Sequence, residues 1–162
     1  MEQGSLEGLF AQARDALART RVATGVEARA LALDFGMAIG RIGRRLFVDP
    51  ARAAEVRDFV GDTAAAIVGH PKLWMWFDAV DDASEPLNAE PDLYIKALRM
   101  RSDLEFFREM YRGSAAGQIV DGLDTDEADA RLEKLAPHYY VADVPDDIPR
   151  EHVWWHRHDR SK

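Results

Sequence analysis

Apolar residues recur at steps of three and four along most of this chain, and this spacing constrains the fold more than any other feature of the sequence. Within residues 26–47 the recurring positions are Ala28, Leu31, Phe35, Ala38, Ile42 and Leu46. Side chains with this spacing line one face of an α-helix, whereas a half-buried strand requires strict alternation of apolar and polar residues. No segment shows a convincing period of two. The pattern predicts an all-α protein.

The stripes and the residues that bound them predict about five helices. We expect these helices at about residues 5–20, 26–47, 50–67, 91–112 and 124–136. The fourth is predicted to bury the seam Leu93, Ala97, Met100, Leu104, Phe107 and Tyr111. Because each stripe covers only one side of its helix, the helices must pack together to bury it. Residues 1–136 are therefore predicted to form a single-domain helical bundle.

Three segments interrupt or follow the predicted helices. Residues 78–92 are acidic and contain two prolines, so we expect a connector there. Residues 113–117 begin and end with glycine and are predicted to break the chain before the fifth helix. Residues 137–162 are rich in proline, aromatic residues and histidine. We expect them to form an extended C-terminal tail that packs on the bundle or on a partner.

Composition narrows the class of protein. The chain has 162 residues, of which 47% are hydrophobic and 31% charged, as is typical of a soluble globular domain. No apolar run approaches the roughly 18 residues of a membrane span. The first residues lack the charged and apolar regions of a secretion signal, and the sequence contains no cysteine. We therefore expect a cytoplasmic protein that does not enter a membrane.

The net charge of −8 lies entirely in the second half of the chain. Residues 1–80 carry ten basic and ten acidic residues, whereas residues 81–162 carry eleven basic and nineteen acidic ones. Binding to nucleic acid depends on clustered cations that neutralise phosphates, so this balance disfavours a nucleic-acid partner. It is compatible with a protein partner.

The last eleven residues before the terminal lysine hold three of the five histidines and two of the four tryptophans. If a helix begins at Pro149, His152, His156 and Asp159 share one face, and two histidines with a carboxylate suit zinc or iron. If the segment is extended, this set does not form. The sequence requires no cofactor, so a divalent metal here is a hypothesis.

Trp154 and Trp155 in the same segment have two interpretations. They anchor the tail on the bundle, or they form part of an interface, because tryptophan dominates the energetics of many protein interfaces. A second aromatic stretch, residues 74–77, contains Trp74 and Trp76 and is predicted to close one end of the bundle. Both tryptophans are also candidate binding residues.

Gly36, Gly40 and Gly43 form a stripe along the predicted second helix. Each interior glycine costs about 1 kcal/mol relative to alanine, so the stripe requires an explanation. One explanation is the close approach of a neighbouring helix. The other is a groove that accepts a ligand or a partner's helix, bounded by the aromatic residues 74–77.

Arg41, Arg44 and Arg45 follow in the last turns of the same helix. Cations at this position complement the negative end of the helix dipole, which accounts for them without any ligand. They could also bind a phosphate, an acidic partner or the acidic connector of the chain itself.

The sequence favours binding over catalysis. It contains no glycine-rich phosphate loop, no zinc-protease signature and no nucleophile elbow. Our leading interpretation is a small soluble protein-interaction or regulatory module, without catalysis of its own, that binds a protein partner or a second copy of itself. The acidic connector and the aromatic tail are its expected surfaces. The alternative is a helical bundle that binds a ligand or metal, through the C-terminal histidines or along the glycine stripe.

Overall fold

The computed structural model describes residues 4–84, 91–139, 141 and 143–156. In this part of the chain every regular element is helical, and the all-α prediction is confirmed. The helices are α1 (Leu6–Val22), α2 (Gly25–Val48), α3 (Ala53–Val68), α4 (Trp74–Ala83), α5 (Pro91–Met110), α6 (Ala115–Asp121) and α7 (Asp126–Leu135). Three single 3-10 turns are η1 (Pro50–Arg52), η2 (Ala136–His138) and η3 (Val153–Trp155). No helix of these ranges is both long and apolar enough to cross a bilayer.

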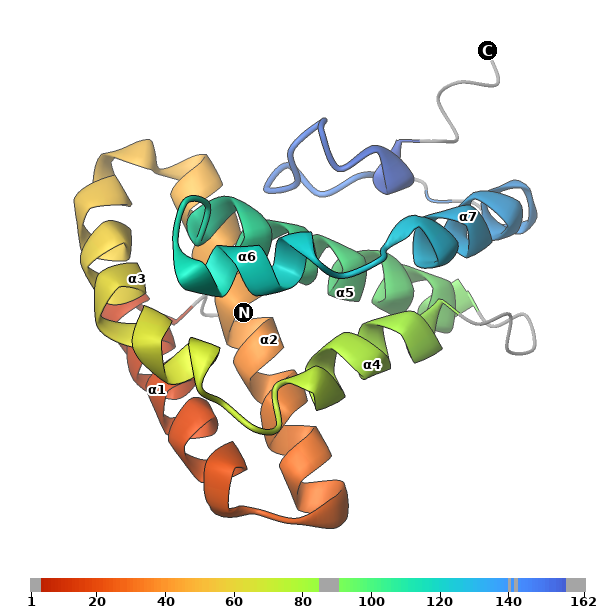
Figure 1. Ribbon diagram of the computed structural model, residues 1–162. Helices are drawn as coiled ribbons and strands as arrows, with labels where there is room; N and C mark the ends of the chain where they lie inside the picture. Colours follow the sequence, from red (N-terminus) through yellow and green to blue (C-terminus); the bar gives the residue numbers. More distant parts are fainter. Residues whose placement is uncertain (1–3, 85–90, 140, 142, 157–162) are drawn as a thin grey trace.

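Serine hydroxyl groups cap the first turns of two of these helices. The Ser5 hydroxyl accepts a hydrogen bond from the Gly8 amide at 3.1 Å and so caps α1. The Ser114 hydroxyl caps α6 in the same way. Between α1 and α2 the chain turns within two residues, and Gly25 adopts a positive φ of 57° at the start of α2. This tight turn lays the two long helices side by side (Figure 1).

The expectation of about five helices was too low, because α4 and α6 occupy segments that were expected to be irregular. The acidic connector was expected from residue 78, but α4 continues to Ala83. It continues because Trp76, Ala79 and Val80 bury one face. The acidic residues on its other faces pair with arginines of distant helices, for example Asp82 with Arg29 at 3.0 Å. Acidic character here marks a solvent-facing side of a helix and not a loop.

The glycine-bounded break at residues 113–117 is also shorter than expected. Gly113 has a φ of 80° and ends the turn after α5, and α6 then starts two residues later. A methyl group at Gly117 would overlap the Tyr111 carbonyl oxygen, so this glycine lets α6 pack closely against the end of α5. Gly117 therefore lies inside a helix and serves the packing of two elements.

The main core lies among the first six helices, around α2 (Figure 1). Its centre is Trp76 of α4, which is 1% exposed. The Trp76 ring meets Phe35 of α2 and Phe107 of α5 edge-on, with ring centroids 5.9 and 5.4 Å apart. Edge-to-face aromatic contacts of this kind fix the relative positions of three helices.

A second, smaller core joins α5 to α7 and to the C-terminal segment, which we define as residues 143–156. Its fully packed residues are Tyr94, Ala97, Leu98, Phe106, Leu132, Ile148, Trp154 and Trp155. In Figure 1 this segment, in blue, lies over α5 beside α7. Helix α5 therefore buries two faces, one in each core.

Candidate functional site

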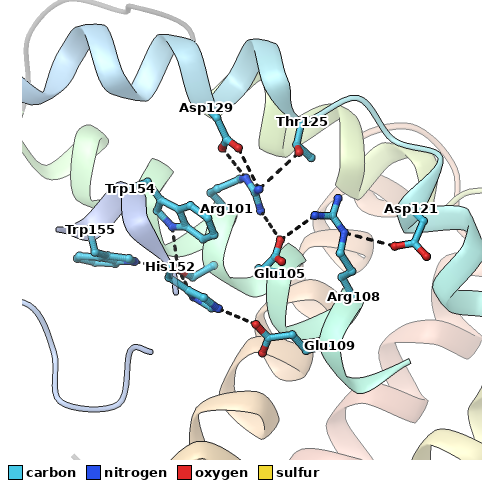
Figure 2. Close-up of polar contacts among 11 residues, drawn as sticks. Arg101, Glu105, Arg108, Glu109, Asp121, Thr125, Asp129, His152, Trp154 and Trp155 are labelled. Carbon is cyan, nitrogen blue, oxygen red and sulfur yellow. Dashed lines mark hydrogen bonds and ion pairs between the residues drawn. The ribbon is translucent and has the colours of Figure 1, made fainter. Parts of the chain in front are cut away.

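The C-terminal segment is held on α5 by a polar centre at Ser102. Figure 2 shows the side chains around this centre, with His152 of the segment facing Glu109 of α5. The Ser102 hydroxyl is fully buried, and it accepts hydrogen bonds from the indole N–H groups of Trp154 at 3.0 Å and Trp155 at 2.8 Å. Because a serine oxygen has two lone pairs, these bonds fill its capacity as an acceptor. Its own proton is left for Nδ1 of His152, which lies 3.0 Å away. His152 therefore accepts at Nδ1 and carries its proton on Nε2.

The other nitrogen of His152 faces a carboxylate. Its Nε2 lies 3.2 Å from an oxygen of Glu109, so Ser102, His152 and Glu109 are connected in the order of a catalytic triad. A nucleophilic serine, however, needs a free lone pair and access to substrate. Ser102 has neither, because both lone pairs face indole N–H groups and its exposed fraction is 0%. The arrangement anchors the segment and does not activate a nucleophile.

Arg101, the residue before Ser102, connects the same centre to α7. It makes two hydrogen bonds to the Asp129 carboxylate, at 2.7 and 3.1 Å, and one to Glu105 at 3.0 Å. Its guanidinium also lies over the Trp154 ring, 4.2 Å from the centroid. Burial alone would lower the pKa of Arg101, but the bonds and charges of Asp129 and Glu105 outweigh this and raise it. The positive charge of Arg101 is thus balanced by two carboxylates, and its contacts hold α5, α7 and the segment together.

The histidines proposed as metal ligands lie in this segment. His152 precedes a single 3-10 turn rather than the helix assumed for the ligand set, and both of its ring nitrogens already bond within the chain. Asp159 lies outside the described residues. No group of three potential ligands occurs in the part of the chain that the structure describes. To bind a metal, His152 would first have to break its bond to Ser102 or Glu109.

Helices α4 and α5 both pack against α2 at its glycine stripe. A methyl group at Gly36 would overlap the indole of Trp76, one at Gly40 the carboxylate of Asp103, and one at Gly43 the ring of Phe106. The position of a β-carbon on each glycine is therefore occupied by one of the chain's own side chains, although Gly43 also lines a small hollow of about 170 Å³. Close helix packing, one of the two explanations considered, accounts for all three.

The three arginines at the end of α2 separate in the structure. Arg44 reaches Asp103 at 3.2 Å and Asp147 of the C-terminal segment at 3.6 Å. Arg45 donates to the Gly4 carbonyl at 3.1 Å, and Arg41 is exposed. The acidic groups that meet Arg44 therefore come from α5 and from the C-terminal segment, not from the expected connector.

Asp103 is the most perturbed acid of the described residues. Burial raises its pKa to about 7, against the opposing attraction of Arg44, Arg41 and Arg99. The carboxylate lies directly over Gly40, between α2 and α5. Its shift therefore arises from burial between the two packed helices.

The four tryptophans differ sharply in exposure. Trp76, Trp154 and Trp155 are at most 4% exposed, whereas Trp74 is 57% exposed. Trp74 shares this exposure with Val22 and Val26, which flank the α1–α2 turn and are 81% and 87% exposed. We call these three residues the apolar end.

The apolar end is held together by contacts between the α1–α2 turn and the loop that leads into α4. Lys72 donates to the carbonyls of Arg21 and Ala23, which flank Val22. Met75, next to Trp74, packs against a small cluster of Ala23 in this turn and Ala28 and Leu31 of α2. Figure 1 shows this loop passing in front of α2 above the turn. The sequence identified Trp74, but it could not show that the loop before it is bonded to the turn that Val22 and Val26 flank.

A groove that the sequence did not indicate lies between α2, α4 and α5. Its volume is about 330 Å³. It is lined by Arg29, Leu33, Ala79, Asp82, Ala83, Leu93, Tyr94, Lys96, Met100, Leu135 and Tyr139. We call it the α4–α5 groove. The sequence feature that could have indicated this groove is the pair Ala79 and Ala83, one helical turn apart. This pair lies in the segment that was expected to be a connector.

No family model matches this chain, and comparison with curated proteins and with solved structures gives no significant match.

Proposed function

We propose that this protein is a small cytoplasmic helical interaction module that binds a protein partner or a second copy of itself, without catalysis of its own. The observation that carries the proposal is the apolar end. One tryptophan and two valines are more than half exposed there, on neighbouring segments.

Exposure of the apolar end to water has a free-energy cost. Burying an apolar side chain contributes about 1.5–3 kcal/mol, so covering three of them favours association substantially. Tryptophan is also the residue most enriched among those that dominate interface energetics. A partner that covers Trp74, Val22 and Val26 would recover this free energy.

The tail and the acidic connector support the proposal less than expected. Trp154 and Trp155 are buried in the second core of the chain itself. The acidic residues of α4 are largely paired within the chain, as Asp81 is with Arg131 at 3.1 Å. The proposed interaction surface therefore moves from the C-terminal segment to the apolar end.

The test compares Trp74→Ser with Phe47→Ser. Phe47 is a matched control, because it is an aromatic residue 45% exposed near the opposite end of α2, about 30 Å from Val26 at 1.5 Å per residue. Self-association is measured by sedimentation velocity, and partner binding by quantitative capture from extract with all three proteins in parallel. We expect Trp74→Ser to weaken the association at least about tenfold and Phe47→Ser to leave it unchanged.

Two results would contradict this proposal. Equal loss in both variants, or loss with Phe47→Ser alone, would place the interaction away from the apolar end. The proposal would also lose its support if the wild-type protein remains monomeric and captures the same proteins from extract as Trp74→Ser does.

A further inference from the structure

We propose that the α4–α5 groove binds a small amphipathic anion, a molecule with an apolar chain and one carboxylate. This site is separate from the apolar end and does not depend on the proposed interaction. Three properties of the groove support it: its size, its lining and the charges at its rim.

The groove is large enough for a ligand because two small residues face it. Ala79 and Ala83 are one turn apart on α4, and their methyl groups leave a hollow of about 330 Å³ between this helix and its neighbours. Ligand pockets range upward from about 300 Å³. The same volume would otherwise hold on the order of ten water molecules against apolar walls. Filling it with hydrocarbon releases that water.

The walls are mostly hydrocarbon. Leu33 of α2, Met100 of α5 and Leu135 of α7 contribute to them, and Leu93 at the start of α5 is 42% exposed. At one side the rings of Tyr94 and Tyr139 stack with centroids 4.9 Å apart and form a flat wall. An apolar chain is the ligand body that such a lining accepts best.

The charges of the groove favour an anionic group on that ligand. Among the described residues of its lining are two cations, Arg29 and Lys96, and one carboxylate, Asp82. Asp82 is already bound to Arg29 at 3.0 Å. Within the described residues no ion pair of Lys96 is found, so its ammonium is the group that would meet a ligand carboxylate. Because Arg29 and Asp82 neutralise each other, a ligand cation would meet the like charge of Lys96.

The test uses decanoate, decanol and decylamine, three molecules of the same chain length whose head groups are anionic, neutral and cationic. Each is titrated into isotopically labelled full-length protein below the concentration at which it forms micelles, and backbone amide shifts are followed by NMR. We expect saturable shifts confined to α4, the first turns of α5 and the facing turns of α2. Decanoate should bind about two- to fivefold more tightly than decanol, and decylamine more weakly than both.

Two variants separate the two parts of the ligand. Lys96→Gln, at an exposed position, should reduce decanoate affinity about two- to fivefold and leave decanol affinity unchanged. Ala83→Leu fills the groove and should abolish binding of both, whereas Ala65→Leu, at an exposed alanine of α3, should not. Circular dichroism checks that Ala83→Leu folds; if it does not, Lys96→Gln and the location of the shifts decide the question.

The proposal is overturned if none of the three molecules shows saturable shifts, or if the shifts lie outside the groove. It is also overturned if decylamine binds as tightly as decanoate, or if a folded Ala83→Leu protein binds decanoate as the wild type does. None of these results depends on Trp74, so they leave the proposed interaction to its own test.

Discussion

Ser102 shows how much a single small residue can organise. One hydroxyl satisfies the indole N–H groups of Trp154 and Trp155 and the acceptor nitrogen of His152, all of which are buried. A buried polar group without a partner costs about 1–3 kcal/mol, so this one side chain prevents three such penalties. Its proton can serve only one acceptor, which is why the geometry fixes the tautomer of His152.

Asp103 is an acidic residue whose buried position disfavours its ionised form. The side chain is 7% exposed and pairs with Arg44, yet burial still raises its pKa to about 7. The folded protein therefore holds this proton at pH values where an unfolded aspartate, with a pKa of 3.8, has released it. The contribution of Asp103 to stability is thus greatest below pH 3.8 and is lost as the pH rises through about 7.

We expect Asp103→Asn to remove this pH dependence, because the amide has nearly the shape of the protonated carboxyl group and does not ionise. Relative to the wild type, the variant should gain stability as the pH rises from about 4 to about 7, by on the order of 4 kcal/mol at the upper end. Urea unfolding at several pH values measures the difference. Asp58→Asn, at an exposed position of α3, is the control. A difference from wild type that stays constant with pH would contradict the assignment.

At the scale of elements, α5 is the helix on which the rest of the fold depends. Met100, Leu104 and Phe107 face the main core, whereas Leu98 and Phe106 face the second core. The predicted seam of α5 describes only the first of these faces well. Leu93, expected in the seam, lines the groove and is 42% exposed. A helix with two buried faces has a weak periodic signal, because apolar residues surround most of its circumference.

The packing of α2 against α4 gives a prediction at the same scale. We expect Gly36→Ala to lower the free energy of unfolding by about 1–3 kcal/mol, because the added methyl group overlaps the indole of Trp76, which Phe35 and Phe107 hold in place. Gly61→Ala, inside α3 with open space around it, should instead raise stability by about 0.5–1 kcal/mol. Chemical denaturation measures both. If the two substitutions changed stability in the same direction, close packing would not explain Gly36.

At the scale of the whole molecule, the C-terminal segment completes a core and is not an appendage. Trp155 is 2% exposed, while Val153, two residues earlier, is 46% exposed. We expect Trp155→Ala to cost about 3–5 kcal/mol and Val153→Ala to change stability by less than about 0.5 kcal/mol. Deleting residues 137–162 should destabilise the protein further, because it uncovers the α5 and α7 side chains of the second core. Thermal and urea unfolding measure all three changes.

A truncated protein with wild-type stability would contradict this view of the segment. It would mean that α5 and α7 keep their structure without the buried tryptophans, and that the segment is free to leave the bundle. The sequence interpretation, in which the tail serves association, would then regain its support.

The sequence by itself determined the all-α class and most helix positions. It could do so because a stripe repeats within a few consecutive residues, and because caps such as Ser5 act on neighbouring backbone groups. The same local reasoning missed α4 and α6, whose stability depends on partners far along the chain. The acidic residues Asp81 and Asp82 suggested a loop, but in the structure Asp82 pairs with Arg29 and Asp81 with Arg131.

Only the tertiary structure decided what the notable residues do. Sequence reasoning selected Gly36, Trp74, Trp155 and His152, but it could not tell which of them are covered. Trp74 is exposed and Trp155 buried because of helices that pack from distant parts of the sequence. The α4–α5 groove likewise exists only where helices from distant parts of the chain meet. Helical period is a property of consecutive residues, whereas burial and cavities depend on which surfaces the folded chain brings together.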